Sequence, residues 1–200
     1  MINARIVRIA VATLALTAAN AAQAGELSSI DRQRLVAHLE MTSSWLIDEV
    51  SGLSRAQLDF RPAPGAWTIS ETLDHVVMVG EIYWDDLQKA VKSRPGAGIV
   101  ANRDVDILWY GIDRTHRETA IATETPREGG RDLSAALAAY RKHHARLLEY
   151  ARTTADDLRS HYVPRQGSEA YQWALLISTH EQRHILQIRE IKASPKFPRR

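Results

Sequence analysis

Apolar residues recur at spacings of three and four along four long segments of this chain, which is the pattern of amphipathic helices. The first predicted helix covers residues 29–50 and stops at Ser51-Gly52. The second begins at Thr68, because Glu71 three positions later completes a capping box, and it runs to about residue 93. The N-terminal half of the folded domain is therefore predicted to supply two long helices.

The C-terminal half predicts two further helices of similar length. One runs from Leu133, behind Asp132 as its cap, to about residue 153, and the other runs from Glu169 to about residue 193. Residues 94–130 form a long crossover that reads as one irregular helix or two short pieces. No segment alternates convincingly with a period of two residues, so we expect an all-α four-helix bundle with a long crossover between its second and third main helices.

Residues 1–24 have the pattern of a secretory signal peptide. Arg5 and Arg8 precede an apolar run over residues 9–19, and Ala22-Gln23-Ala24 is a cleavage site of small-x-small type. An uncleaved membrane anchor is the alternative, but the apolar run is short for a membrane span. We therefore predict a periplasmic or secreted protein, with residues 25–200 as the mature helical domain and no stable anchor after cleavage.

Charge and cysteine content exclude several classes of ligand and catalytic site. Two of the 26 Lys and Arg lie in the predicted signal peptide, so the remaining 24 balance the 24 Asp and Glu. This balance argues against nucleic-acid binding, which needs a clustered basic face. The chain has no cysteine, which excludes a thiolate nucleophile and cysteine-ligated metals. Any metal must be held by His, Asp, Glu or water.

A pair of histidines in the last predicted helix is the main chemical signal. His180 and His184 are four residues apart, so they differ by only about 40° around the helix and their rings can converge on one point. Apolar residues share their face, which therefore points into the interior. The alternative is that both are ordinary core histidines with hydrogen-bond partners, so a metal site needs a third ligand.

His75 is the candidate third ligand. It lies in the second predicted helix outside the polar sector, between apolar neighbours, where a histidine needs a partner for each ring nitrogen. His144 is a weaker candidate for a fourth ligand, because its position fits the apolar stripe of the third main helix. His38 reads as a boundary residue and His116 as a solvated one.

Three stretches together resemble the DinB-like (DinB/YfiT) superfamily over about residues 29–192. They are Pro64-Gly65-Ala66-Trp67-Thr68-Ile69, Leu73-Asp74-His75-Val76 and His180-Glu181-Gln182-Arg183-His184-Ile185-Leu186-Gln187. The resemblance implies a four-helix bundle that binds a divalent metal through His75, His180 and His184. Members include thiol-dependent S-transferases, a mycothiol-dependent isomerase and many proteins without an assigned reaction. The resemblance therefore specifies metal binding better than it specifies a reaction.

The favoured function is a metal-dependent enzyme of hydrolase or transferase type acting on a small molecule. An exported protein fits thiol transfer poorly, because small thiols are chiefly cytosolic. Imidazole ligands favour zinc or nickel as the divalent metal, although they also suit iron and copper. Glu181 is a candidate general base or a helix-surface carboxylate paired with arginines. Gln187 orients a ligand imidazole or, as we favour, satisfies a buried backbone group.

Two other functions stay open at this stage. His180-Glu181-Gln182-Arg183-His184 matches the HExxH motif of metallopeptidases, but only 16 residues follow His184 and none is a histidine. Glu190, the nearest downstream carboxylate, faces about 120° away from His184. The other alternative is a non-catalytic metal-binding module. The sequence does not decide whether the chain forms a homodimer.

Overall fold

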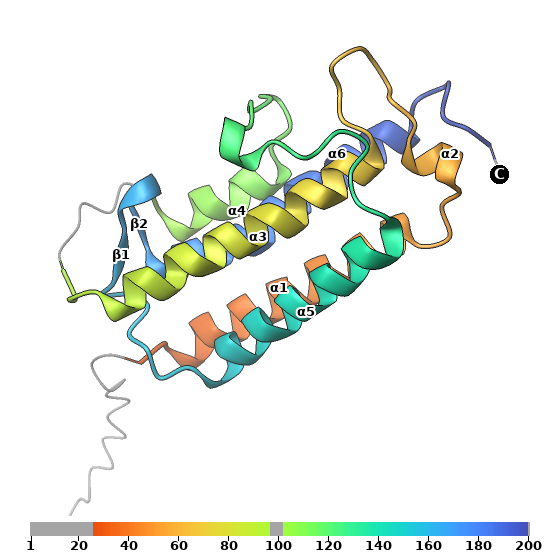
Figure 1. The fold of residues 1–200 in the computed structure, drawn as a ribbon. Helices are drawn as coiled ribbons and strands as arrows, with labels where there is room; N and C mark the ends of the chain where they lie inside the picture. Colours follow the sequence, from red (N-terminus) through yellow and green to blue (C-terminus); the bar gives the residue numbers. More distant parts are fainter. Residues whose placement is uncertain (1–25, 97–101, 200) are drawn as a thin grey trace, which may run out of the picture.

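Four long helices form the body of the computed structural model, which describes residues 26–96 and 102–199 (Figure 1). They are α1 (Ser29–Val50), α3 (Ile69–Lys92), α5 (Leu133–Thr153) and α6 (Ala170–Lys192). The predicted all-α four-helix bundle is confirmed, with its long crossover between α3 and α5. The predicted signal peptide, residues 1–24, lies outside the described residues, so export stays a prediction.

Short elements fill the connections between the main helices. They are α2 (Arg55–Leu58), α4 (Asp104–Ile112), the 3-10 turns η1 (Ala122–Glu124) and η2 (Pro164–Gln166), and the strands β1 (Tyr162–Val163) and β2 (Ser168–Glu169). The crossover thus contains two short helical pieces, α4 and η1. The antiparallel β1–β2 pair was not expected, because two-residue strands are too short to show an alternating pattern.

The helix starts follow from side-chain caps that the sequence encodes. At the start of α3, Thr68 Oγ1 accepts from the Glu71 backbone N–H at 3.1 Å, and the Glu71 carboxylate accepts from the Thr68 N–H at 2.9 Å. Asp132 Oδ1 accepts from the Ser134 N–H at 2.9 Å at the start of α5. These caps satisfy N–H groups that have no partner inside the helix.

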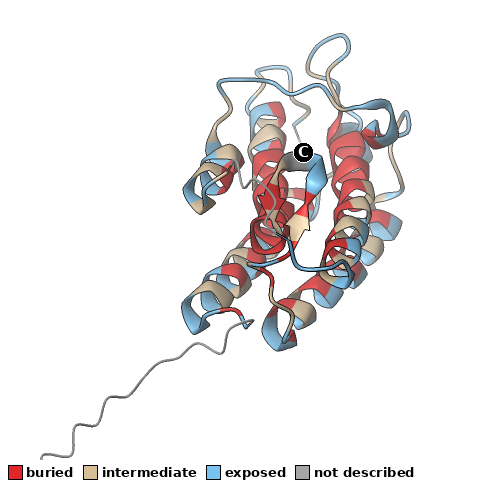
Figure 2. Ribbon diagram, turned by 90° about the vertical axis from the view of Figure 1, so that its left-hand side faces the viewer, coloured by how far each residue is buried: buried red, intermediate tan, exposed pale blue. Residues whose placement is uncertain are grey.

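Helix α6 is the most enclosed element of the bundle. It contacts α1 on one side and α3 on the other, and α4 packs against it from outside (Figure 1). As a result, 17 of its 23 residues are buried. Most polar side chains on α6 must therefore find their partners within the protein, because water reaches few of them (Figure 2).

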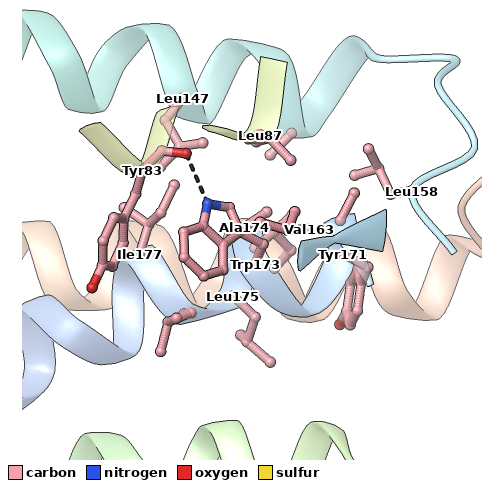
Figure 3. Packing of buried hydrophobic residues seen from close by; sticks show 14 of the residues in the cluster. Tyr83, Leu87, Leu147, Leu158, Val163, Tyr171, Trp173, Ala174, Leu175 and Ile177 are labelled. Carbon is pink, nitrogen blue, oxygen red and sulfur yellow. Dashed lines mark hydrogen bonds between the residues drawn. The ribbon is translucent and has the colours of Figure 1, made fainter. Parts of the chain in front are cut away.

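The apolar core consists of two clusters that meet α6 at different heights. The first surrounds Trp173, whose indole Nε1 donates to the Tyr83 carbonyl at 2.9 Å (Figure 3). The second includes Tyr140 and the α6 residues Ile185, Ile188 and Ile191. Residues 178–184 of α6 belong to neither cluster, and six of these seven are buried. The bundle therefore contains a polar zone between two apolar ones.

The end of α4 is fixed from α6 by a buried arginine. Arg183 donates to the Tyr110 carbonyl at 3.1 Å and also to the carbonyls of Asp113 and His116. These carbonyls lie at or just past the end of α4 and have no partner within it.

In the described part of the chain, no helix combines the length and the apolar character needed to cross a membrane.

Candidate metal centre

Three histidine rings from two helices meet inside the polar zone. His180 Nε2 lies 3.1 Å from His75 Nε2 and 3.1 Å from His184 Nε2. Their ligand atoms all lie within 4.8 Å of one another, and all three side chains are buried. Ligand nitrogens around a tetrahedral zinc ion, with bonds of about 2.0–2.1 Å, would be about 3.3 Å apart. The spacing of the rings therefore fits a metal ion.

Hydrogen bonds to the far ring nitrogens decide which nitrogen carries the proton. His75 Nδ1 lies 2.6 Å from the Glu124 backbone oxygen, which can only accept, so the proton of His75 is on Nδ1. His184 Nδ1 lies 2.9 Å from Gln187 Oε1, which fixes its proton in the same way. Both rings then point an Nε2 lone pair at His180, the arrangement that a metal ligand requires.

The three rings cannot satisfy one another by hydrogen bonding. His180 Nε2 can donate at most one proton, while two lone pairs face it from His75 and His184. At least one lone pair is thus left without a proton donor from these rings, and a cation would serve all three. The residues present therefore fit a divalent metal.

Burial keeps these imidazoles neutral. Desolvation lowers the pKa of His75 to about 4, and the charge of neighbouring Asp74 only partly offsets this. Desolvation likewise lowers the pKa values of His180 and His184 far below the ordinary value, with repulsion among the rings adding to the effect. Neutral imidazoles are the form that binds a metal, so the site is ready to do so near pH 7.

Aromatic side chains border the histidine cluster. The Trp67 ring lies 4.8 Å from the His75 ring and 6.3 Å from the His184 ring, measured between centroids. The Tyr83 ring lies 5.6 Å from the His180 ring. These apolar surfaces limit the access of water, and charge interactions are stronger where water is excluded.

Glu181, the candidate general base, points toward α1 and α5. Its Oε2 accepts from Thr42 Oγ1 at 3.0 Å and from the Tyr140 hydroxyl at 3.1 Å. The residue is 2% exposed, so its interpretation as a helix-surface carboxylate is wrong. Desolvation raises its pKa to about 8, which its hydroxyl partners only partly oppose. Its catalytic role stays a prediction, and the hydrogen bonds found for its carboxylate do not involve the histidine cluster.

Other candidates of the sequence have clear positions. Gln187 contacts the His184 imidazole, so our preference for a backbone partner was wrong. Glu190 forms two hydrogen bonds of 2.9 Å with Arg114, which gives it a partner outside the site. His144 is buried beside Tyr140, with its ring stacked at 5.6 Å, and does not belong to the three-histidine group.

Two further histidines behave as their sequence context indicates. His38 is half-buried and lies 2.8 Å from Ser178 Oγ, whereas His116 is exposed. Sequence reasoning missed Glu124, which contributes through its backbone carbonyl. Because every residue carries such a carbonyl, no side-chain signal could have identified this position.

Comparison with known proteins identifies a family and a shared fold. A family model described as the DinB superfamily matches residues 32–188. The uncharacterized protein YuaE of Bacillus subtilis (strain 168) is 26% identical over 149 residues, covering 72% of this chain and 89% of YuaE. The structure of YfiT from Bacillus subtilis aligns with a TM-score of 0.57 at 19% identity, covering 84% of this chain and 89% of YfiT. YfiT is described as a probable metal-dependent hydrolase with an unusual four-helix bundle topology. Since the family model matches most of the chain, from within α1 to within α6, this chain belongs to the DinB superfamily.

Proposed function

We propose that this protein is a metal-dependent enzyme of hydrolase or transferase type that acts on a small molecule. The observation that carries the proposal is the convergence of three buried Nε2 atoms, with the protons of His75 and His184 held on the opposite ring nitrogens. The description of YfiT as a probable metal-dependent hydrolase supports the same reaction class.

Each residue around the site has a distinct task. His75, His180 and His184 would hold the metal, while Glu124 and Gln187 orient two of the rings. A divalent cation held by these three ligands would supply Lewis acidity toward a water molecule or a substrate carbonyl. Trp67 and Tyr83 border the histidines and exclude bulk water.

The metallopeptidase alternative has less support from the geometry. In an HExxH site the glutamate acts as general base beside the metal. Here Glu181 is hydrogen-bonded to Thr42 and Tyr140, and the third histidine comes from upstream, on α3. If Glu181→Gln abolished cleavage of a casein-like substrate by the metal-loaded protein, the peptidase would replace our proposal.

Zinc or nickel is the proposed metal, because a site made only of neutral imidazoles suits both. Metal analysis of the purified wild-type protein should find about one divalent ion per chain. His75→Ala should lose this ion, whereas His116→Ala, which changes an exposed histidine, should keep it. Undiminished metal affinity in His75→Ala would reject the three-histidine site.

Catalysis and export are tested separately. A metal-loaded protein that stays inactive across hydrolase and transferase substrate panels would favour the non-catalytic module.

Export is proposed from residues 1–24 alone, with their arginines, apolar run and Ala22-Gln23-Ala24. Mass spectrometry of the periplasmic protein should find Gly25 as the new N-terminus, and an intact Met1 in the cytoplasm would contradict export.

A further inference from the structure

We infer that Arg165 is a positioning residue of the histidine cluster, acting on His75 through Glu124. The inference rests on the proposed metal site and concerns a residue outside it. Arg165 lies in η2, between the two short strands, while Glu124 ends η1 in the crossover. The Arg165 guanidinium forms an ion pair with the Glu124 carboxylate. The Glu124 backbone oxygen in turn accepts from His75 Nδ1 at 2.6 Å.

The same arginine also contacts α3, the helix that carries His75. Arg165 Nη1 lies 3.5 Å from Asp86 Oδ2, and its guanidinium lies 5.3 Å from the centre of the Tyr83 ring. Tyr83 itself borders the His180 ring. Arg165 therefore joins the end of η1 to the face of α3 beside the histidines.

Near η1, the crossover makes few other polar contacts with the main helices among the described residues. Of residues 121–127, only Glu124 and Pro126 are buried, and Pro126 has no side-chain polar group. The next polar contacts come later in the chain, where the Arg127 N–H donates to Asp74 at 3.3 Å, Arg127 Nε lies 3.4 Å from the same carboxylate, and the Gly129 N–H donates to Glu71 at 3.1 Å. Without Arg165, the Glu124 carboxylate would lose the ion pair that holds it, and the carbonyl that fixes the His75 proton would be held less firmly.

The sign of the effect separates positioning from simple electrostatics. A guanidinium near a cation site repels the cation, so its removal should tighten metal binding if charge alone mattered. If Arg165 instead fixes the His75 ring, its removal should weaken binding, as the loss of residues that orient metal ligands typically does by about 10–100-fold.

The experiment compares wild type with Arg165→Gln, Arg165→Lys and Arg159→Gln. Arg159 is the matched control: like Arg165 its side chain is 32% exposed, pairs with carboxylates and lies over a tyrosine ring, here Tyr171. Co²⁺ affinity is measured by chelator competition, with the visible Co²⁺ bands as a spectroscopic signature. The tautomer of His75 is read in the metal-free proteins from ¹⁵N imidazole resonances, which requires no activity.

We expect Arg165→Gln to weaken Co²⁺ binding by about 10–100-fold and to shift His75 from the Nδ1–H toward the Nε2–H tautomer. Arg165→Lys keeps the positive charge, so it should retain part of the Co²⁺ affinity and part of the Nδ1–H tautomer of His75. Arg159→Gln should change neither, whatever it does to thermal stability. Adding Arg165→Gln to Glu124→Ala should cause little further loss, because both substitutions break one contact.

Unchanged or tighter Co²⁺ binding by Arg165→Gln, with an unchanged His75 tautomer, would overturn the inference. A wild-type protein that fails to bind Co²⁺, Zn²⁺ or Ni²⁺ would instead overturn the proposed function. In that case a tautomer shift in metal-free Arg165→Gln would still support the positioning of His75, so the two failures can be told apart.

Discussion

Two buried polar clusters include residues of α6, and they differ in how completely their hydrogen-bond donors and acceptors are paired. The histidine cluster of His75, His180 and His184 has more lone pairs pointing inward than proton donors to meet them. In the second cluster, Glu181 accepts two hydroxyl hydrogen bonds, from Thr42 and Tyr140. The first arrangement fits a cation, whereas the second is a hydrogen-bond network within the core.

This difference shows that neighbouring residues in one motif can have separate tasks. His180 and Glu181 are adjacent in the sequence but point about 100° apart on the helix, toward α3 and toward α1 and α5 respectively. The five-residue match to HExxH is therefore divided between the candidate metal centre and a buried hydrogen-bond network. Substitutions in the two clusters should change different measured quantities.

The largest effect is expected from His180→Ala, which removes the central ligand. Metal affinity should fall by at least about 10³-fold, since two imidazoles remain and the two 3.1 Å contacts of His180 are lost. Addition of zinc at about 100 times the wild-type dissociation constant should stabilise the wild type by about 2.7 kcal/mol and leave His180→Ala unchanged. Chelator competition and thermal unfolding measure both effects. Equal stabilisation of the two proteins would remove the distinction between the clusters.

Glu181→Ala should mainly lower the free energy of unfolding. It removes the acceptor of the Tyr140 hydroxyl and opens a cavity, at a cost of about 2–4 kcal/mol, while the Thr42 hydroxyl keeps the Leu39 carbonyl as an acceptor. Glu181→Gln preserves the shape and an acceptor oxygen, so it should cost less than about 1.5 kcal/mol. Urea unfolding of the metal-free proteins provides the measurement, and both variants should keep wild-type metal affinity once folded. Loss of metal binding in Glu181→Gln would contradict this separation and show that Glu181 and the three histidines form one site.

Gln187→Ala should have an intermediate effect, confined to the metal site. The substitution removes the acceptor that lies 2.9 Å from His184 Nδ1, so the ring is free to rotate and change tautomer. Metal affinity should fall by about 10-fold, with little change in the stability of the metal-free protein. Gln187→Glu, which keeps an acceptor, is the matched control and should retain or exceed wild-type affinity. Loss of affinity in both variants would assign Gln187 another role.

The smallest effect at neutral pH is expected from His144→Phe, beside the Glu181 network. His144 Nδ1 is buried and has no hydrogen-bond partner among the described residues, so phenylalanine should add about 1 kcal/mol of stability. Burial lowers the pKa of His144 from 6.5 to about 4 in the folded protein. The unfolded chain therefore takes up a proton first as the pH falls, and wild type loses stability from about pH 6.5 down to about 4.

The advantage of His144→Phe should accordingly grow between pH 6.5 and pH 4, by no more than about 1.4 kcal/mol per pH unit. Urea unfolding of metal-free wild type and variant at several pH values would measure this. A stability difference that is constant across this range would mean that the His144 pKa is the same in the folded and unfolded states.

Some features were predictable because local rules encode them. The bounds of α1 and α5 match the prediction, since their apolar periodicity is regular and their ends carry strong signals. The capping box of Thr68 and Glu71 fixes the start of α3 for the same reason. The start of α6 at Ala170 lies one residue after the predicted Glu169. The β1–β2 pair was missed, because two-residue strands depend on contacts rather than on periodicity.

The sequence by itself determined the four helices and the residue types able to hold a metal, because helical periodicity and ligand chemistry are local properties. Only the tertiary structure decided that Glu124 orients His75, that Gln187 orients His184 and that Glu181 belongs to the core network. Each of these depends on which helix or loop packs against the residue and on how far water is excluded there. The sequence indicates that one face of α6 is buried, but it does not show which carbonyl or side chain from another segment each polar residue of α6 contacts.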